Sequence, residues 1–302
     1  MTDDLASLLA SGERAAFHGR PAAGVDPLER AVSLATANHL PAESAAALWL
    51  LAVCQGAAGR FGQAVGALAA LLPVPFDASP ERRMFGALGE ATLASIHRQL
   101  GGHATARAHD EIALTLSDAV GEAGFDALLG LSADAVGLGE AAAAQDHLAA
   151  AAALAGHHPE WWRQRVRVGW VQTEVALLEG RPADAVVAAA AAVDRAERAG
   201  APRHVAKGLL FQGVALVEAG QQDAAAGILR RAGLLAESLG TLPLLWPARA
   251  VLGALVGERD AQDSQRCFQS ARRAVELIAA DLPESMRTDW FARPDVAALL
   301  AE

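Results

Sequence analysis

The chain has 302 residues, of which 53% are hydrophobic and 20% are charged, and its formal net charge is −10 at pH 7. It has no block rich in lysine and arginine, which phosphate binding requires, and no apolar run approaching the ~20 residues that span a bilayer, so neither direct nucleic-acid binding nor membrane insertion is expected. The acidic segment 1–14 lacks the basic start of a secretory signal, and Cys54 and Cys267 lie far apart in sequence, so we expect a cytoplasmic protein with free thiols.

Apolar residues recur at helical spacing along the chain, without the sustained alternation that strands show, and this predicts an all-α fold. The helices are expected in pairs joined by short turns. In chain order the pairs are 3–18 with 25–38, 42–58 with 61–72, 79–100 with 103–121, 123–137 with 140–155, 162–180 with 182–200, 202–219 with 221–239 and 242–256 with 260–281. Two short helices after Pro283 and Pro294 are expected to close the stack.

Three helix boundaries carry specific signals. Asp26 is expected to cap a helix that begins at Pro27, because an aspartate accepts hydrogen bonds from first-turn N–H groups. Pro159 is expected in the first turn of a helix, where a missing N–H costs nothing. The proline-rich segment 72–80 is expected to be a loop, with Ser79 as the cap of the following helix.

A glycine marks the end of each first helix, at intervals of 37 to 42 residues by subtraction of the residue numbers: Gly19, Gly59, Gly101, Gly139, Gly180, Gly220 and Gly257. Five residues after most of these glycines stands an alanine: Ala64, Ala106, Ala144, Ala185 and Ala225. Glycine reaches the left-handed C-cap conformation cheaply, and the small residue lets the next helix pack closely. A fixed period of this kind is the signature of a stacked helix–turn–helix array.

These features resemble the tetratricopeptide repeat, with the best fit at Gly213, Gly220, Ala225 and Ala232. The period is nearer 40 than the ~34 of the standard unit, and the chain has no tyrosine. In its longer unit the chain resembles the arms of bacterial LuxR-type and signal-transduction ATPase regulators. The single lysine among many arginines suggests a GC-rich bacterial genome.

The resemblance implies a right-handed superhelical solenoid of antiparallel helix pairs, with about seven repeats and a C-terminal cap. We expect one domain over residues 1–302. Its repeats are expected at about 3–40, 41–75, 79–121, 122–156, 159–200, 201–240 and 241–281, with the cap at 282–302.

Tetratricopeptide arrays bind their ligands on a concave face lined by the first helix of each pair. In this chain the resemblance assigns to that face Trp49, Ser95, Arg98, Arg163, Arg167, Trp170, Glu174, Lys207 and Phe211. Aromatic side chains with a few charges form binding hot spots, although tryptophans also pack between repeats. The run Arg163, Arg165 and Arg167 either anchors a carboxylate or acidic peptide or forms a solvated face.

Members of this family that bind chaperone tails use a clamp of lysine and asparagine. The matching positions of this chain hold other residues, among them Trp49, Ser95, Trp170 and Glu174, which argues against a receptor for chaperone tails. His157 and His158 precede a proline without a zinc-binding spacing. Motifs for a nucleophile elbow, a P-loop or a dinucleotide-binding turn are also missing. No catalytic residue, cofactor or metal is therefore expected.

The preferred hypothesis is a non-catalytic protein–protein interaction scaffold that binds a peptide or partner protein on its concave face. One alternative is a ligand- or peptide-sensing regulatory module that acts through a partner chain. The other is an enzyme on a helical solenoid, which is disfavoured because no aspartates, histidines or cysteines converge in the sequence pattern. The identity of the partner and self-association into a homo-oligomer stay open.

Overall fold

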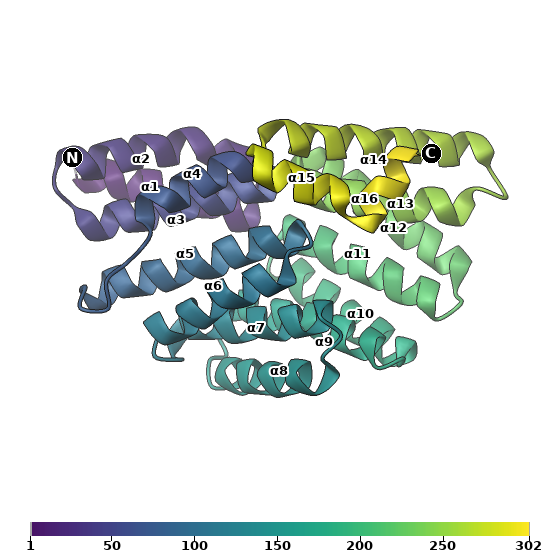
Figure 1. Cartoon of the computed structure of the whole chain (residues 1–302), viewed down its shortest axis with the longest axis horizontal. Helices are drawn as coiled ribbons and strands as arrows, with labels where there is room; N and C mark the ends of the chain where they lie inside the picture. The colour runs from purple at the N-terminus through teal and green to yellow at the C-terminus, as the bar shows by residue number, and fades with distance from the viewer. Residues whose placement is uncertain (1, 302) are drawn as a thin grey trace.

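The computed structural model describes residues 2–301, and this part of the chain is all-helical, as expected. The helices are α1 (Thr2–His18), α2 (Val25–Ala37), α3 (Pro41–Ala58), α4 (Phe61–Leu71), α5 (Pro80–Gln99), α6 (His103–Leu116), α7 (Gly121–Gly137), α8 (Ala141–Gly156), α9 (Trp162–Leu178), α10 (Pro182–Arg198), α11 (Pro202–Glu218), α12 (Gln222–Leu239), α13 (Leu242–Val256), α14 (Ala261–Asp281), α15 (Glu284–Ala292) and α16 (Pro294–Ala301). A short 3-10 helix, η1 (Pro21–Gly24), joins α1 to α2. Consecutive helices pack as adjacent pairs, which makes the protein an α-solenoid (Figure 1).

The solenoid curls until its last pairs return to its first. In Figure 1 the yellow C-terminal helices lie beside the purple N-terminal ones, and α13 contacts α3 while α14 contacts α4. Asp281, the last residue of α14, accepts hydrogen bonds from the backbone N–H groups of Gly62 at 2.6 Å and Gln63 at 3.2 Å. The hydroxyl of Thr241, before α13, donates to the carbonyl of Ala57 at 2.7 Å. The array is therefore closed into a ring by contacts between segments far apart in sequence.

Two of the boundary predictions are wrong. The 3-10 helix η1 runs directly into α2, so Gly24 already has helical dihedral angles. Asp26 consequently lies inside the first turn of α2 and makes no capping hydrogen bond. Pro159 lies in a turn that precedes α9, where the N–H of Trp161 donates to the carbonyl of His158 at 3.1 Å.

The predictions for the proline-rich segment are confirmed. Helix α4 ends at Leu71 and α5 begins at Pro80. The hydroxyl of Ser79 accepts a hydrogen bond from the backbone N–H of Arg82 at 3.3 Å, as an N-cap side chain does. Residues 72–79 therefore form a loop between the second and third pairs.

Most of the repeat glycines have the left-handed conformation that was expected. The φ angle is positive at Gly59, Gly101, Gly139, Gly180 and Gly220, with values from +69° to +88°. Gly19 and Gly257 do not have a positive φ, and so they do not end their helices in this way. The alanines that follow five residues later, from Ala64 to Ala225, are completely buried in the second helices. Each second helix therefore packs closely against its neighbours at this alanine.

Candidate ligand-binding cavity

A cavity of about 170 Å³ lies inside the ring. Each first helix from α1 to α13 contributes to its wall, and Thr241 lines it from the position before α13. The polar, charged and aromatic lining residues are Phe17, Trp49, Thr92, Ser95, Gln99, Asp126, Arg163, Arg167, Trp170, Arg203, Lys207 and Thr241. The curvature of the solenoid therefore gathers side chains from all seven first helices around one space.

Four cations line this cavity, in two pairs that belong to neighbouring first helices. Arg163 and Arg167 lie on α9, and Arg203 and Lys207 lie on α11. Within each pair the residues are four positions apart, so both side chains project from the same helix face. Helix α9 packs directly on α11, which brings the two pairs together.

The pair on α9 is neutralised by helix α7. Arg167 forms an ion pair with the buried carboxylate of Asp126, and Arg163 lies 3.7 Å from the same carboxylate. Arg163 also pairs with Glu122 at 3.0 Å, and its guanidinium lies 5.1 Å from the ring centre of Phe17. The carboxylates of α7 thus hold these two arginines in place.

The pair on α11 has no such counter-charge. Among the side chains that the structure describes, residues 4–301, no carboxylate lies within ion-pair distance of Arg203 or Lys207. Arg203 Nε donates to the carbonyl of Ala16 at 3.4 Å. Lys207 Nζ lies 4.7 Å from the ring centre of Trp170 and 5.5 Å from that of Phe211. Lys207 therefore rests on two aromatic faces, a cation–π arrangement.

Burial makes these two cations expensive to keep charged. It lowers the pKa of Lys207 to about 8, an effect that the Glu174 carboxylate opposes and the guanidiniums of Arg167 and Arg203 strengthen. Burial likewise lowers the pKa of Arg203 to about 10, with Arg167 contributing in the same direction. Burial also raises the pKa of Glu174. This carboxyl group is therefore less able to supply a negative charge to Lys207. The cavity consequently holds excess positive charge in an acidic protein.

An aromatic hollow of about 490 Å³ adjoins the cavity and shares Phe17, Trp49 and Arg163 with it. The rings of Phe17 and Trp49 lie 6.4 Å apart, and that of Phe85 lies 6.1 Å beyond Trp49. Trp162 adds its indole to the same wall. Glu13, Glu122 and Glu160 line the hollow as well, so a ligand group in the cavity would continue onto a surface that carries both aromatic rings and carboxylates.

The structure brings most of the sequence-predicted site residues together. Trp49, Ser95, Arg163, Arg167, Trp170 and Lys207 all line the cavity. Glu174 and Phe211 lie outside its wall, close to Lys207. Sequence reasoning missed Arg203, although its position four residues before Lys207 on one helix was an available signal. Whether these residues bind a partner stays a prediction.

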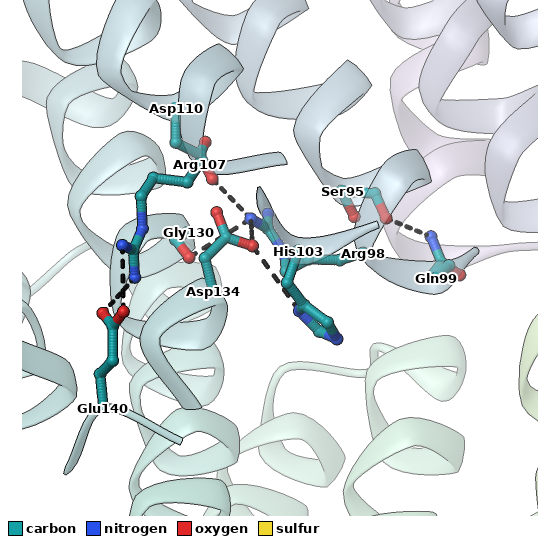
Figure 2. A network of polar contacts seen from close by, with 9 residues as sticks. All are labelled: Ser95, Arg98, Gln99, His103, Arg107, Asp110, Gly130, Asp134 and Glu140. Atoms are coloured by element: carbon teal, nitrogen blue, oxygen red, sulfur yellow. Dashed lines mark hydrogen bonds and ion pairs between the residues drawn. The ribbon is translucent and has the colours of Figure 1, made fainter. Parts of the chain in front are cut away.

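Arg98 belongs to a different arrangement, which Figure 2 shows. Its guanidinium pairs with Asp110 at 2.5 Å and Asp134 at 2.9 Å, and it donates to the carbonyl of Gly130 at 3.3 Å. Both carboxylates are completely buried, and burial raises the pKa of Asp110 to about 8. The network ties α5 to α6 and α7, so Arg98 serves the packing of three helices.

No helix in residues 2–301 is both long and apolar enough to cross a bilayer. Among the side chains described, no three histidine, cysteine, aspartate or glutamate residues gather in a way that would hold a metal ion. Both cysteines are buried and free.

The repeating helix pairs, the small residues at fixed positions and the inward-facing first helices define a tetratricopeptide-like helical repeat protein. No protein-family model and no curated protein matches the chain by sequence. Solved structures do match it by fold. A Rap protein in complex with competence and sporulation factor is 9% identical, with a TM-score of 0.67 over 99% of this chain and 89% of that chain.

Two further structures are similar. The apo form of RapI is 10% identical, with a TM-score of 0.50 over 99% of this chain and 84% of that chain. Aspartyl phosphate phosphatase F from Bacillus subtilis is 13% identical, with a TM-score of 0.51 over 98% of this chain and 82% of that chain. At these identities the likeness establishes the fold alone.

Proposed function

We propose that this protein is a non-catalytic scaffold that takes a short segment of a partner protein, or a free peptide, into the cavity of its ring. The observation that carries the proposal is the convergence of all seven first helices on one space lined by aromatic and charged side chains. A helical repeat protein of the same fold has been solved in complex with competence and sporulation factor, which supports a binding role.

The dimensions favour an extended segment over a folded domain. The cavity of about 170 Å³ and the adjoining hollow of about 490 Å³ share part of their walls. Ligand sites commonly measure about 300–1,000 Å³. A few residues of extended chain fit this space, with one side chain or chain end inside and the next residues against Trp49 and Phe17.

The lining suits binding better than catalysis. Asp126, the carboxylate among the described lining residues, is held by Arg163 and Arg167, so it is poorly placed to act as a base. Aromatic rings and cations supply affinity and orientation. The likeness to aspartyl phosphate phosphatase F is too distant in sequence to transfer an activity.

A second candidate function is a sensing module in the cytoplasm that acts through a partner chain. The favouring observation is that Thr241 both lines the cavity and closes the ring through its bond to Ala57. A ligand there would stabilise the closed ring relative to open forms, because it binds the closed state preferentially. The relation to LuxR-type arms stays a prediction.

A cavity-filling variant tests the proposal. Peptides selected from a random display library on the wild-type protein are measured by fluorescence anisotropy against Ser95→Trp, which fills the cavity, and against Ser238→Trp. Ser238 is exposed on α12 and serves as the matched control. We expect at least about tenfold weaker binding for Ser95→Trp, equivalent to ~1.4 kcal/mol, and little change for the control. Peptides that bind both variants equally would disprove binding in the cavity.

A further inference from the structure

The charge of the cavity is unusual for this protein. The chain has 25 lysine and arginine residues against 35 aspartate and glutamate residues, and its one lysine is Lys207. Arg203 and Lys207 form none of the ion pairs found among the described side chains, although both line the cavity. In a protein with more acidic than basic residues, four cations around one small cavity are a local concentration of positive charge.

Burying a cation without a counter-charge is unfavourable, and groups whose pKa is strongly shifted by burial are concentrated at functional sites. The lowered pKa values of Lys207 and Arg203 reflect this. Glu174 is the one acid that acts on Lys207 among the groups that shift it, and it forms no ion pair with it. A bound anion would supply the missing charge.

We propose that the cavity is a carboxylate-binding site, in which Arg203 and Lys207 on α11 receive one carboxylate of the bound peptide. The inference rests on the proposed function and adds the chemistry that the ligand must carry. The residue next to that carboxylate would pack against Trp49 and Phe17 in the aromatic hollow.

A single negative charge fits better than a phosphate. Asp126 and Glu122 already offset Arg167 and Arg163, and Glu174 acts on Lys207. Counted with Glu174 ionised, the four cations face three carboxylates, and a carboxylate ligand neutralises the excess of one positive charge, whereas a phosphate carries about −1.5 to −2 at neutral pH. The fork of an arginine guanidinium also matches the two oxygens of a carboxylate.

The carboxylate has two sources in a peptide, the end of the chain and an acidic side chain. The probes are N-acetyl-alanyl-alanine, which has a free chain end, and N-acetyl-aspartate N-methylamide, which has only a side-chain carboxylate. The amide of N-acetyl-alanyl-alanine serves as the neutral control. Inorganic phosphate is the fourth probe. The stronger of the two acids identifies the source.

The single lysine gives a direct readout. Reductive ¹³C-methylation labels Lys207 and the α-amino group alone, so NMR follows the site without assignment. The charged groups that act on Lys207 are Glu174 and Arg167 on α9, Arg203 on α11 and Arg98 on α5. The acid probes should shift the Lys207 signal and raise its titration midpoint, and the amide should bind at least about tenfold more weakly because it lacks the charge-assisted bonds.

Arg203→Gln should weaken the acid probes at least about tenfold without affecting the amide. Arg195→Gln, on the exposed face of α10, is the matched control and should bind like the wild type. If Arg203→Gln fails to fold, Lys207→Met measured by calorimetry replaces it, with the same expected loss.

Three outcomes overturn the inference in distinguishable ways. Equal binding of acid and amide, with library peptides still bound in the cavity, overturns the carboxylate site and leaves the scaffold function intact. Phosphate binding tighter than either acid contradicts the choice of a single negative charge. Binding of the acids without binding of any library peptide overturns the scaffold function, and the site then serves a small free acid.

Discussion

Two clusters of buried cations stand on neighbouring parts of the inner wall, and they differ in their counter-charges. Arg98 lies between two completely buried carboxylates, Asp110 and Asp134, and fastens α5, α6 and α7 (Figure 2). Arg203 and Lys207 line the cavity without a paired carboxylate among the described side chains. The first cluster is complete within the fold, whereas we propose that a ligand completes the second.

On this proposal, the difference separates charge that stabilises the fold from charge that binds a ligand. Arg98, Arg203 and Lys207 all lie on first helices, and the repeat register assigns Arg98 and Lys207 to the same concave face. Their roles differ because their neighbours differ: α6 and α7 supply acids to Arg98, while aromatic rings surround Lys207. Removing a cation should therefore mainly lower the stability of the fold at Arg98 and mainly lower ligand binding at Lys207.

The largest effect is expected for Arg98→Met. The substitution leaves Asp110 and Asp134 buried without their cation, and breaking a buried pair in this way costs about 3–5 kcal/mol. Urea unfolding followed by circular dichroism measures the change. A loss below ~1 kcal/mol would show that the network contributes no more than a surface ion pair.

The next largest loss of stability is expected when a contact that closes the ring is removed. Asp281→Ala removes the acceptor for the N–H groups of Gly62 and Gln63, and loss of a helix cap costs about 0.5–2 kcal/mol. We also expect a larger radius of gyration in solution scattering, and a Lys207 titration midpoint nearer its ordinary value because the cavity opens to water. Asp146→Ala, an exposed position on α8, is the control. If the free energy of unfolding falls by the expected amount while the radius of gyration is unchanged, the cap does not hold the ring closed.

Lys207→Met should change the free energy of unfolding by less than about 1 kcal/mol, because relief of an unpaired buried charge offsets a lost cation–π contact. The same variant should lose carboxylate binding. Thermal unfolding and calorimetry on one sample give both numbers. A loss as large as that of Arg98→Met would place Lys207 in the structural cluster.

Two pH dependences of opposite sign are also expected. Burial raises the pKa of Asp110 from 3.8 to about 8, so the unfolded chain binds fewer protons in that range and stability falls as pH rises through it. The lowered pKa of Lys207 makes the unfolded chain bind more protons between about 8 and 10.5, and stability rises there. Unfolding free energies measured against pH should lose the first slope in Asp110→Asn and the second in Lys207→Met. If a slope persists in the variant that lacks the assigned residue, a different titratable group causes it.

Local signals were enough for the helix pairs and their register. The alanines from Ala64 to Ala225 are buried as expected, and Ser79 caps α5. Glycine conformations, caps and apolar spacing act within a few residues, so a sequence pattern contains them. The same register pointed to six cavity residues, because inward-facing positions repeat with the period.

Only the tertiary structure shows which of those inward-facing positions hold a cation without a paired carboxylate. It alone also shows where the last repeats contact the first. Asp281 caps a helix that begins near Gly62, more than 200 residues earlier, and no local signal connects them. Arg98 received its partners from α6 and α7, and Arg203 received none from any described helix, although both are arginines on first helices. Charge compensation depends on distances between helices, which superhelical curvature sets and residue spacing along one helix does not.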